Sequence, residues 1–502
     1  MREHPPWLRR GFKACFMIIS VTFIGSCSAN SASNLIGSNS NRQVIRVAIG
    51  TQDQVINTAV GGAVVRELEL LQKHLPRTGK YENVEYEIDW SSYTSGPPIT
   101  NKMMAGQIDI GLMGDFPAVI NMLTFQKEVA NADSLFIGTL AYSPTGAGNA
   151  VVVPKDSPVT SLADLRGKTV SVPFGSAAHG MLLQALETEG LNPEQDLKLI
   201  SQSPEVGGSS LRTGQIDAHA DFVPFGELFP FRGFARKIFD GAQTGQPTLH
   251  GIVVRSDFAQ QYPEVVVAYM KAVLEANQMF RATPEAIAAK IQEWSGVEKE
   301  VVYMFLGRSG LQTLSPAIED IHLKALKNSV ATLIELGRVD ASIKPDSITQ
   351  WVDDSYLKQA AEEMSINYDK MVAEARDYAI AGNDALTNEP IENSNMAVQL
   401  WVQGEEEVMN FASISNMLQM LPKLQEEGKV ANVLFVHDRE NGWKLFAENS
   451  YFVQAGSELS AFLSAQAAQK FASTSGGRVA DFKGLQQFYA RQSQQALLLP
   501  SQ

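Results

Sequence analysis

The chain has 502 residues, of which 44% are hydrophobic and 19% charged, and its formal net charge is −14. The length exceeds one typical domain, and the composition is that of folded units with cores rather than of a disordered chain. The acidic balance argues against nucleic acid as a partner, although it leaves room for a small anion held by backbone N–H groups. We therefore expect two or three globular units.

The N-terminus has the pattern of a secretory signal. Four basic residues precede an uncharged run over 14–25, which is too short for a stable membrane span. The following Ile24-Gly25-Ser26-Cys27 resembles a bacterial lipobox. We expect a signal peptide over 1–26, a lipid anchor on Cys27, a flexible tether over 27–43, and a periplasmic or cell-surface lipoprotein. The only other cysteine, Cys15, lies in the predicted signal, so the mature chain lacks a disulfide pair.

The folded part begins with α/β units. Strands are predicted over 44–49 and 86–90, with an apolar-periodic helix over 60–75 between them. A further helix is predicted over 99–105, after the turn Ser95-Gly96-Pro97-Pro98, because proline is tolerated in the first helical turn.

The tetrapeptide Gly-Gln-Ile-Asp occurs twice, over 106–109 and 214–217. In each copy we expect a helix to end at the glycine and a buried strand to start at the isoleucine and aspartate. The strands would open into loops over 114–117 and 221–224. Because ligands of α/β proteins bind beyond the carboxyl ends of strands, two such loops predict two lobes that face a common cleft.

Two predicted strands, over 149–153 and 250–254, would carry the chain between the lobes and form a hinge. This places lobe 1 at about 44–148 and 250–375, and lobe 2 at about 149–249. The pattern over 263–371 is mostly helical, and the polar stretch 381–394 is predicted to be a linker. Beyond it we expect a duplicated ββαβ-like α+β domain over 395–493. Its predicted helices cover 414–424, 459–471 and 485–491.

The stretch over 162–191, with the second Gly-Gln-Ile-Asp after it, resembles the extracytoplasmic solute-binding proteins of ABC importers of the nitrate, taurine and aliphatic sulfonate type. The resemblance covers roughly 44–375 within a predicted solute-binding domain over 44–380. It implies a two-lobed periplasmic-binding-protein type II fold, a small ligand between the lobes, and a membrane permease as partner.

The resemblance also implies which loops hold the ligand. Loop and helix-start positions would grip an anionic head at Ser95 and Gly96 from one lobe and at Gly175, Ser176 and Ala177 from the other. We expect further ligand contacts from Thr51, Gln52, Gly114, Asp115, Phe116, His179, Glu205, Asp221 and Phe222. The two aspartates would accept from an amine such as that of taurine, or equally would bind buried N–H groups. His179 and Glu205 have a structural alternative as well.

Residues from about 395 to 488 resemble a degenerate form of NosL, the copper lipoprotein that accompanies nitrous oxide reductase. Where that family has Met-Gly and His-Gly-Gly elements, this chain has Ala455-Gly456 and Ser475-Gly476-Gly477, and it lacks the family's cysteines. We therefore expect no bound metal, and we interpret Met417 and Met420, three residues apart, as core side chains.

The chain lacks phosphate-binding, dinucleotide-binding and nucleophile-elbow motifs, so we expect neither an enzyme nor a cofactor. Three functions remain: a solute receptor of an importer, a metal-handling or assembly accessory lipoprotein that acts through the C-terminal domain, and a ligand sensor. The first is the prediction, with hinge closure around the solute as its mechanism.

Overall fold

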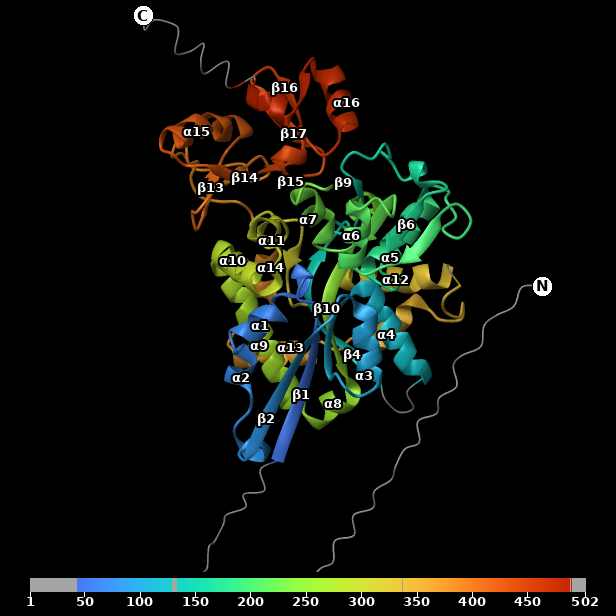
Figure 1. The fold of residues 1–502 in the computed structure, drawn as a ribbon. Helices are drawn as coiled ribbons and strands as arrows, with labels where there is room; N and C mark the ends of the chain where they lie inside the picture. The colour runs from blue at the N-terminus through green and yellow to red at the C-terminus, as the bar shows by residue number, and fades with distance from the viewer. Residues whose placement is uncertain (1–42, 129–132, 336, 488, 490–502) are drawn as a thin grey trace, which may run out of the picture. The chain divides into compact units, whose positions relative to one another are not determined.

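A computed structural model describes residues 43–128, 133–335, 337–487 and 489 (Figure 1). The predicted signal peptide, Cys27 and nearly all of the predicted tether lie outside these residues. Within them, two α/β lobes precede a β-rich C-terminal region. No helix of the described part of the chain combines the length and apolar character that a membrane crossing needs.

Lobe 1 is built on a six-stranded sheet in the order β11-β4-β10-β3-β1-β2. β1 is parallel to β2 and β3, whereas β10 is antiparallel to β3 and β4. All five residues of β3 are buried, as expected for a strand that helices cover on both faces. The strands are β1 (Gln43–Thr51), β2 (Val84–Ser92), β3 (Ile110–Gly114), β4 (Ser134–Ser143), β10 (Thr248–Arg255) and β11 (Thr313–Leu314).

The helices of lobe 1 pack in two groups, with α9 against α2 and α13, and α12 against α4. The predicted helix over 60–75 is instead two short helices, because Glu69 adopts the left-handed conformation with φ 52°. The helices are α1 (Ala63–Glu67), α2 (Leu70–His74), α3 (Gly96–Met104), α4 (Asp115–Glu128), α8 (Ser256–Gln261), α9 (Pro263–Ala282), α10 (Pro284–Ser295), α11 (Lys299–Leu306), α12 (Asp320–Glu335), α13 (Ser355–Glu363) and α14 (Tyr368–Arg376).

Lobe 2 has a five-stranded sheet in the order β7-β6-β8-β5-β9, in which β6 is parallel to β7 and β8 and β5 is antiparallel to β8 and β9. Its strands are β5 (Ala150–Pro154), β6 (Thr169–Val172), β7 (Lys198–Ser201), β8 (Ala218–Asp221) and β9 (Ala235–Asp240). Its helices are α5 (Ala177–Thr188), α6 (Pro204–Arg212) and α7 (Phe225–Phe231).

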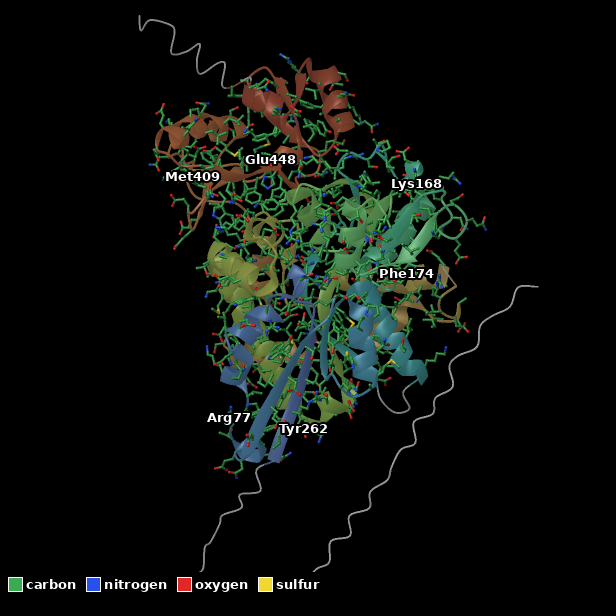
Figure 2. The ribbon with its side chains drawn as sticks, viewed as in Figure 1. Arg77, Lys168, Phe174, Tyr262, Met409 and Glu448 are labelled. Carbon is green, nitrogen blue, oxygen red and sulfur yellow. The ribbon has the colours of Figure 1, made fainter. Side chains whose placement is uncertain are left out.

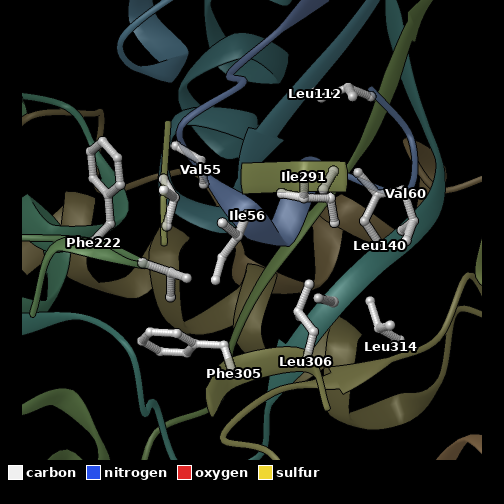
Figure 3. Packing of buried hydrophobic residues seen from close by; sticks show 14 of the residues in the cluster. Val55, Ile56, Val60, Leu112, Leu140, Phe222, Ile291, Phe305, Leu306 and Leu314 are labelled. Carbon is white, nitrogen blue, oxygen red and sulfur yellow. The ribbon is translucent and has the colours of Figure 1, made fainter. Parts of the chain in front are cut away.

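The chain crosses between the lobes twice, over 144–149 between β4 and β5 and over 241–247 between β9 and β10. Apolar side chains of both lobes meet near these crossings. Figure 3 shows Ile56 of lobe 1, Phe222 of lobe 2 and Phe305 of α11 within one buried cluster. The hinge region therefore has a continuous core.

The two Gly-Gln-Ile-Asp copies occupy equivalent places in the two lobes. Gly106 and Gly214 both end a helix in the left-handed conformation, with φ of 67° and 68°. The carboxylate of Asp109 accepts from the N–H of Ala48 at 2.8 Å, and that of Asp217 accepts from the N–H of Thr169 at 2.9 Å. Each aspartate thus ties its segment to the strand that lies parallel beside the next one, β1 in lobe 1 and β6 in lobe 2, and β3 and β8 begin just after it.

The C-terminal region contains two ββαβ sets with the same strand order. The first forms the sheet β13-β12-β14-β15 and the second the sheet β17-β16-β18, with the first strand of each set flanked by the other two. The elements are β12 (Val398–Val402), β13 (Val408–Phe411), α15 (Ile414–Glu426), β14 (Ala431–His437), β15 (Lys444–Phe446), β16 (Tyr451–Ala455), β17 (Glu458–Phe462), α16 (Ala465–Ser475) and β18 (Arg478–Asp481).

One predicted helix in this region is wrong in its position. The residues 459–462 belong to β17, which pairs with β16, and α16 starts only at Ala465 after the N-cap Ser464. The apolar residues Leu459, Ala461 and Phe462 fit the spacing of a helix as well as that of a strand. Pairing with β16 is what makes this segment a strand. The predicted final helix over 485–491 lies partly outside the described residues.

The stretch predicted as a linker is folded where it meets this region. Asp384 is 1% exposed. Its carboxylate accepts from the side-chain amide of Asn416 and from the N–H of Ala412, both at 2.7 Å. The segment is therefore held against the start of α15.

Candidate functional site between the lobes

A cavity of about 30 Å³ lies between the lobes, with room for about one water molecule. Lobe 1 contributes the start of α4 and one side of α12, lobe 2 contributes α5, and both crossings line the remainder. The lining residues are Asp115, Phe116, Gly146, Asn149, Ala177, Gly180, Met181, Gln184, Gly241, Thr244, Gln246, Pro247, Thr248, Ala325, Asn328 and Ser329. None is basic, and Asp115 is the one carboxyl among them.

Asp115 is the first residue of α4 and is 6% exposed. Burial raises its pKa to about 7, although the N–H of Phe116 and the hydroxyl of Thr248 donate to the carboxylate and oppose that rise. The Phe116 N–H lies 2.9 Å from Oδ1. Near neutral pH the group is divided between its charged and neutral forms, so a nearby cation would favour the charged form and a nearby anion the neutral one.

The start of α5 faces Asp115 from lobe 2. Ser176 is the N-cap residue, 2% exposed, and its hydroxyl accepts from the N–H of His179 at 3.2 Å. Ala177, the first helical residue, lines the cavity. The free N–H groups and the dipole at a helix start favour negative charge. The cavity therefore has an acidic wall and an anion-favouring wall.

The lobes touch beside this cavity. A Cβ atom built on Gly180 would lie 2.8 Å from the Phe116 ring, so only glycine lets α5 approach so closely. At Gly175, a Cβ atom would lie 3.1 Å from Pro97 of lobe 1. Any solute larger than water therefore needs the lobes to move apart from this arrangement.

His179 closes its own loop rather than lining the cavity. Its Nδ1 accepts from the N–H of Gly175 at 3.1 Å, and its ring stacks on Phe174 with 4.9 Å between centroids. Burial, with a smaller contribution from the charge of Arg338, lowers the pKa of His179 to about 4, so it is neutral at pH 7. Phe174 itself is 45% exposed and is labelled in Figure 2.

Of the fourteen predicted ligand residues, Asp115, Phe116 and Ala177 line the cavity. Thr51 and Gln52 are buried and donate within lobe 1, to Asp53 at 2.7 Å and to the carbonyl of Leu112 at 2.9 Å. The others lie near the lobe contact or away from it. Ser95 is the N-cap residue of α3, Gly96 packs on Pro117, Gly114 faces Ala177, Glu205 is exposed at the start of α6, and Phe222 is in the core.

Asp221 is turned into the core of lobe 2, where Ser171, His219 and Asp221 form a hydrogen-bonded chain. His219 Nδ1 lies 2.7 Å from the Ser171 hydroxyl, and His219 Nε2 lies 2.8 Å from an Asp221 oxygen. All three residues are 0% exposed. The residue types are those of a hydrolase triad, but no substrate reaches a fully buried serine, and the ring nitrogens have the opposite partners. These three hydrogen-bonded side chains therefore have a structural role.

Sequence reasoning missed the polar side chains that come from the crossings and from α12. Two hydrogen bonds join α12 of lobe 1 to the rest of the cavity wall. Gln184 of α5 donates to Thr332 of α12 at 2.6 Å, and Asn328 of α12 donates to Gln246 of the second crossing at 2.8 Å. Asn149 is the first residue of one predicted crossing strand and Thr248 lies just before the other, so the predicted hinge was a signal for them. For α12 the sequence contained no comparable signal.

Among the described residues, no group of three or more His, Cys, Asp or Glu side chains is placed to hold a metal ion. Met417 and Met420 are buried in the core under α15, at 0% and 9% exposure. Their placement is that of packing residues.

Comparison with known proteins gives consistent matches. A family model described as NMT1/THI5 like matches residues 98–287. The taurine-binding periplasmic protein of Escherichia coli (strain K12) is 30% identical over 269 residues, which cover 51% of this chain and 79% of the relative. A putative aliphatic sulfonates-binding protein of the same strain is 24% identical over 281 residues, which cover 56% of this chain and 82% of the relative.

Among solved structures, the alkanesulfonate-binding protein SsuA from Xanthomonas axonopodis pv. citri bound to MOPS aligns with a TM-score of 0.50 and 22% identity. The alignment covers 98% of that chain and 61% of this one, so the likeness shows a shared two-lobed fold. The present chain has a substantial region beyond it.

Proposed function

The chain belongs to the NMT1/THI5-like family of solute-binding proteins of ABC importers, which includes the taurine-binding periplasmic protein, and from this premise we propose which solute it binds and how. The relatives that match by sequence are named as binding proteins. We propose that the cavity between the lobes, once widened from the arrangement described above, holds a small sulfonate with an ammonium group, of which taurine is the simplest, and that the loaded form docks on a membrane permease.

The observation that carries the proposal is the pairing of two walls in one cavity. Asp115 supplies a carboxylate from lobe 1, and the start of α5, at Ser176 and Ala177, supplies an anion-favouring wall from lobe 2. A zwitterion satisfies both walls at once. Nitrate, the other anion that the sequence suggested, would leave Asp115 without a cationic partner and would be repelled when that carboxyl is ionised.

Closure follows from the same geometry. A solute that contacts both lobes stabilises the arrangement in which they approach, whereas a solute that contacts one lobe has no such effect. The two crossings over 144–149 and 241–247 are the segments about which the lobes would move. Amide and hydroxyl groups of Asn149, Gln184, Thr244 and Asn328 would supply the remaining hydrogen bonds.

Thermal-shift measurements on the full chain test the ligand class. We expect taurine to raise the melting temperature and nitrate, bicarbonate and simple amines to have little effect. An Asp115→Asn variant should lose most of the taurine response, while Glu205→Gln, at an exposed position, keeps it. Stabilisation by nitrate but not by taurine would contradict the proposed ligand class.

We also propose that Cys27 carries a lipid that holds the protein at the membrane, on the strength of the Ile24-Gly25-Ser26-Cys27 motif. A Cys27→Ser variant should then leave the membrane fraction. An unchanged membrane association of that variant would overturn the anchor.

A further inference from the structure

The C-terminal region shares a core with the two lobes. In the sheet β13-β12-β14-β15, alternate residues point to opposite faces. On one face, Trp401, Val433, Phe435 and Phe446 belong to the same buried cluster as apolar residues of both lobes. On the other face, Leu400, Leu434, Val436 and Leu445 pack with α15 in a separate cluster. The sheet is thus a packed layer between two cores rather than a tethered module.

On the lobe 1 side, this sheet packs on α11. The Tyr303 ring lies 5.5 Å from Trp401 and 5.7 Å from Phe435, measured between centroids, and its hydroxyl accepts from Gln399 at 3.0 Å. At the edge of the same contact, Asn432 donates to Glu300 at 2.5 Å. Helix α11 packs on α10, which in turn contacts α1 and α9 of lobe 1.

A buried lysine sits inside this contact. Lys444 is 1% exposed, and its ammonium donates to the Arg308 carbonyl at 2.9 Å and to the Gln399 side-chain oxygen at 2.7 Å. It also lies over the rings of Tyr303 and Phe435, at 4.4 and 4.7 Å. An amine without these partners would be costly to bury. Lys444 therefore keeps its partners only while the C-terminal sheet is packed on α11.

On the lobe 2 side, the same sheet contacts the end of α7. The Phe231 ring lies 5.2 Å from Phe446 of β15. The neighbouring Arg232 reaches across to the lobe 1 helices, where its side chain donates to Glu298 at 2.8 Å and to the Gly296 carbonyl at 2.9 Å. One layer therefore touches α11 of lobe 1 and α7 of lobe 2.

The hinge lies between these two contacts. A Cβ atom built on Gly148, in the first crossing, would lie 2.3 Å from Val223, two residues before α7, and 3.3 Å from Phe305 of α11. Gln312, just beyond α11, donates to the Ala147 carbonyl in the same crossing. The elements that the C-terminal sheet covers are thus those that meet the moving segment of the chain.

We propose that the C-terminal region is a brace across the hinge, which holds α7 of lobe 2 against α11 of lobe 1 and so favours the arrangement in which the lobes touch. A contact that exists only in one arrangement raises the population of that arrangement. Because this arrangement has room for about one water molecule, a solute that needs the lobes further apart loses apparent affinity in proportion. The effect on affinity rests on the proposed function, but the effect on the lobes does not.

The test removes the lobe 2 contact without disturbing the sheet. Phe231→Ala deletes a half-buried ring that meets Phe446, and Phe234→Ala, in the same lobe, deletes a half-buried ring that meets Phe229 at 5.1 Å. Spin labels at Glu85→Cys and Glu189→Cys, exposed on lobes 1 and 2, report the distance between lobes in the full chain with Cys15 and Cys27 replaced by serine. Phe446→Leu probes the same contact from the other side.

Without ligand, Phe231→Ala and Phe446→Leu should give a longer or broader distance distribution than the parent, and Phe234→Ala should match the parent. Taurine affinity should rise three- to ten-fold for the first two, because the lobes separate more readily, and stay within two-fold for the third. Identical distributions for all four proteins, each shown by its melting curve to be folded, would overturn the brace. If the parent binds no taurine, the proposed function fails, while the distance measurement still decides on the brace.

Discussion

The two lobes place the same tetrapeptide in the same structural role and then use the next aspartate differently. Asp109 accepts from a backbone N–H of β1 and Asp217 from one of β6, the strands that pair in parallel with β3 and β8. Asp115, six residues on in lobe 1, lines the cavity, whereas Asp221, four residues on in lobe 2, bonds to His219 inside the core. The repeat therefore fixes the scaffold, and the residue that follows decides whether a lobe contributes to binding or to stability.

The largest effect that this comparison predicts is on stability in lobe 2. Asp221→Ala leaves His219 Nε2 and the Phe222 N–H without a partner in a fully buried site, and removing one member of such a group costs about 3–5 kcal/mol. Chemical denaturation should show that loss. Glu205→Ala, at an exposed site in the same lobe, is the control. A loss below about 1 kcal/mol for Asp221→Ala would show that the chain from Ser171 to Asp221 does not stabilise the lobe.

In lobe 1, replacement of Asp115 should change how the free energy of unfolding depends on pH. The pKa of Asp115 is about 7 in the folded protein and near 3.9 in an unfolded chain, so the folded state holds an extra proton between these values. The free energy of unfolding contributed by this group therefore falls as pH rises from 4 to 7 and stays low above 7.

The Asp115→Asn variant lacks that titration. Relative to the parent, it should gain about 2–4 kcal/mol in the free energy of unfolding between pH 4 and pH 8, as measured by denaturation at both values. If the stability difference between parent and Asp115→Asn is the same at both pH values, Asp115 is not the buried titrating group described above.

The smallest effect concerns the repeat itself. Asp109→Asn and Asp217→Asn each replace a charged acceptor of one backbone N–H by a neutral one, and we expect each to cost about 1 kcal/mol. Equal losses in denaturation experiments would support the equivalence of the two copies. A loss more than about 2 kcal/mol larger in one lobe would show that the two aspartates have different roles.

Much of this fold could be predicted, because the strands of both lobes are apolar runs bounded by turn residues and the repeat marked the two lobes. The prediction of one helix over 60–75 was wrong because Glu69 adopts the left-handed conformation and breaks the helix. The sequence has no glycine or proline at that position to indicate a break. The site was harder to predict. Asp115 and Ala177 follow predicted helix or strand ends, but Gln184 and Asn328 become cavity residues only when α5 and α12 of different lobes approach.

Residues such as Phe231 and Phe446 are an extreme case, because they lie 215 residues apart and are ordinary apolar side chains in the sequence. Nothing in local periodicity connects them. Their contact is a property of how three layers pack, which is why the role of the C-terminal region could be inferred only from the structure.

The central claim is that the cavity pairs Asp115 with a cationic group of the solute. The most direct test is the pH dependence of taurine binding, measured by calorimetry at pH 6 and pH 8 in buffers of different ionisation enthalpy. An ammonium beside Asp115 favours the ionised carboxyl, so binding should be tighter at pH 8 and should release protons at pH 6, with neither effect in Asp115→Asn. Tighter binding at pH 6 with uptake of protons would mean that an anion lies beside Asp115 and would contradict the account.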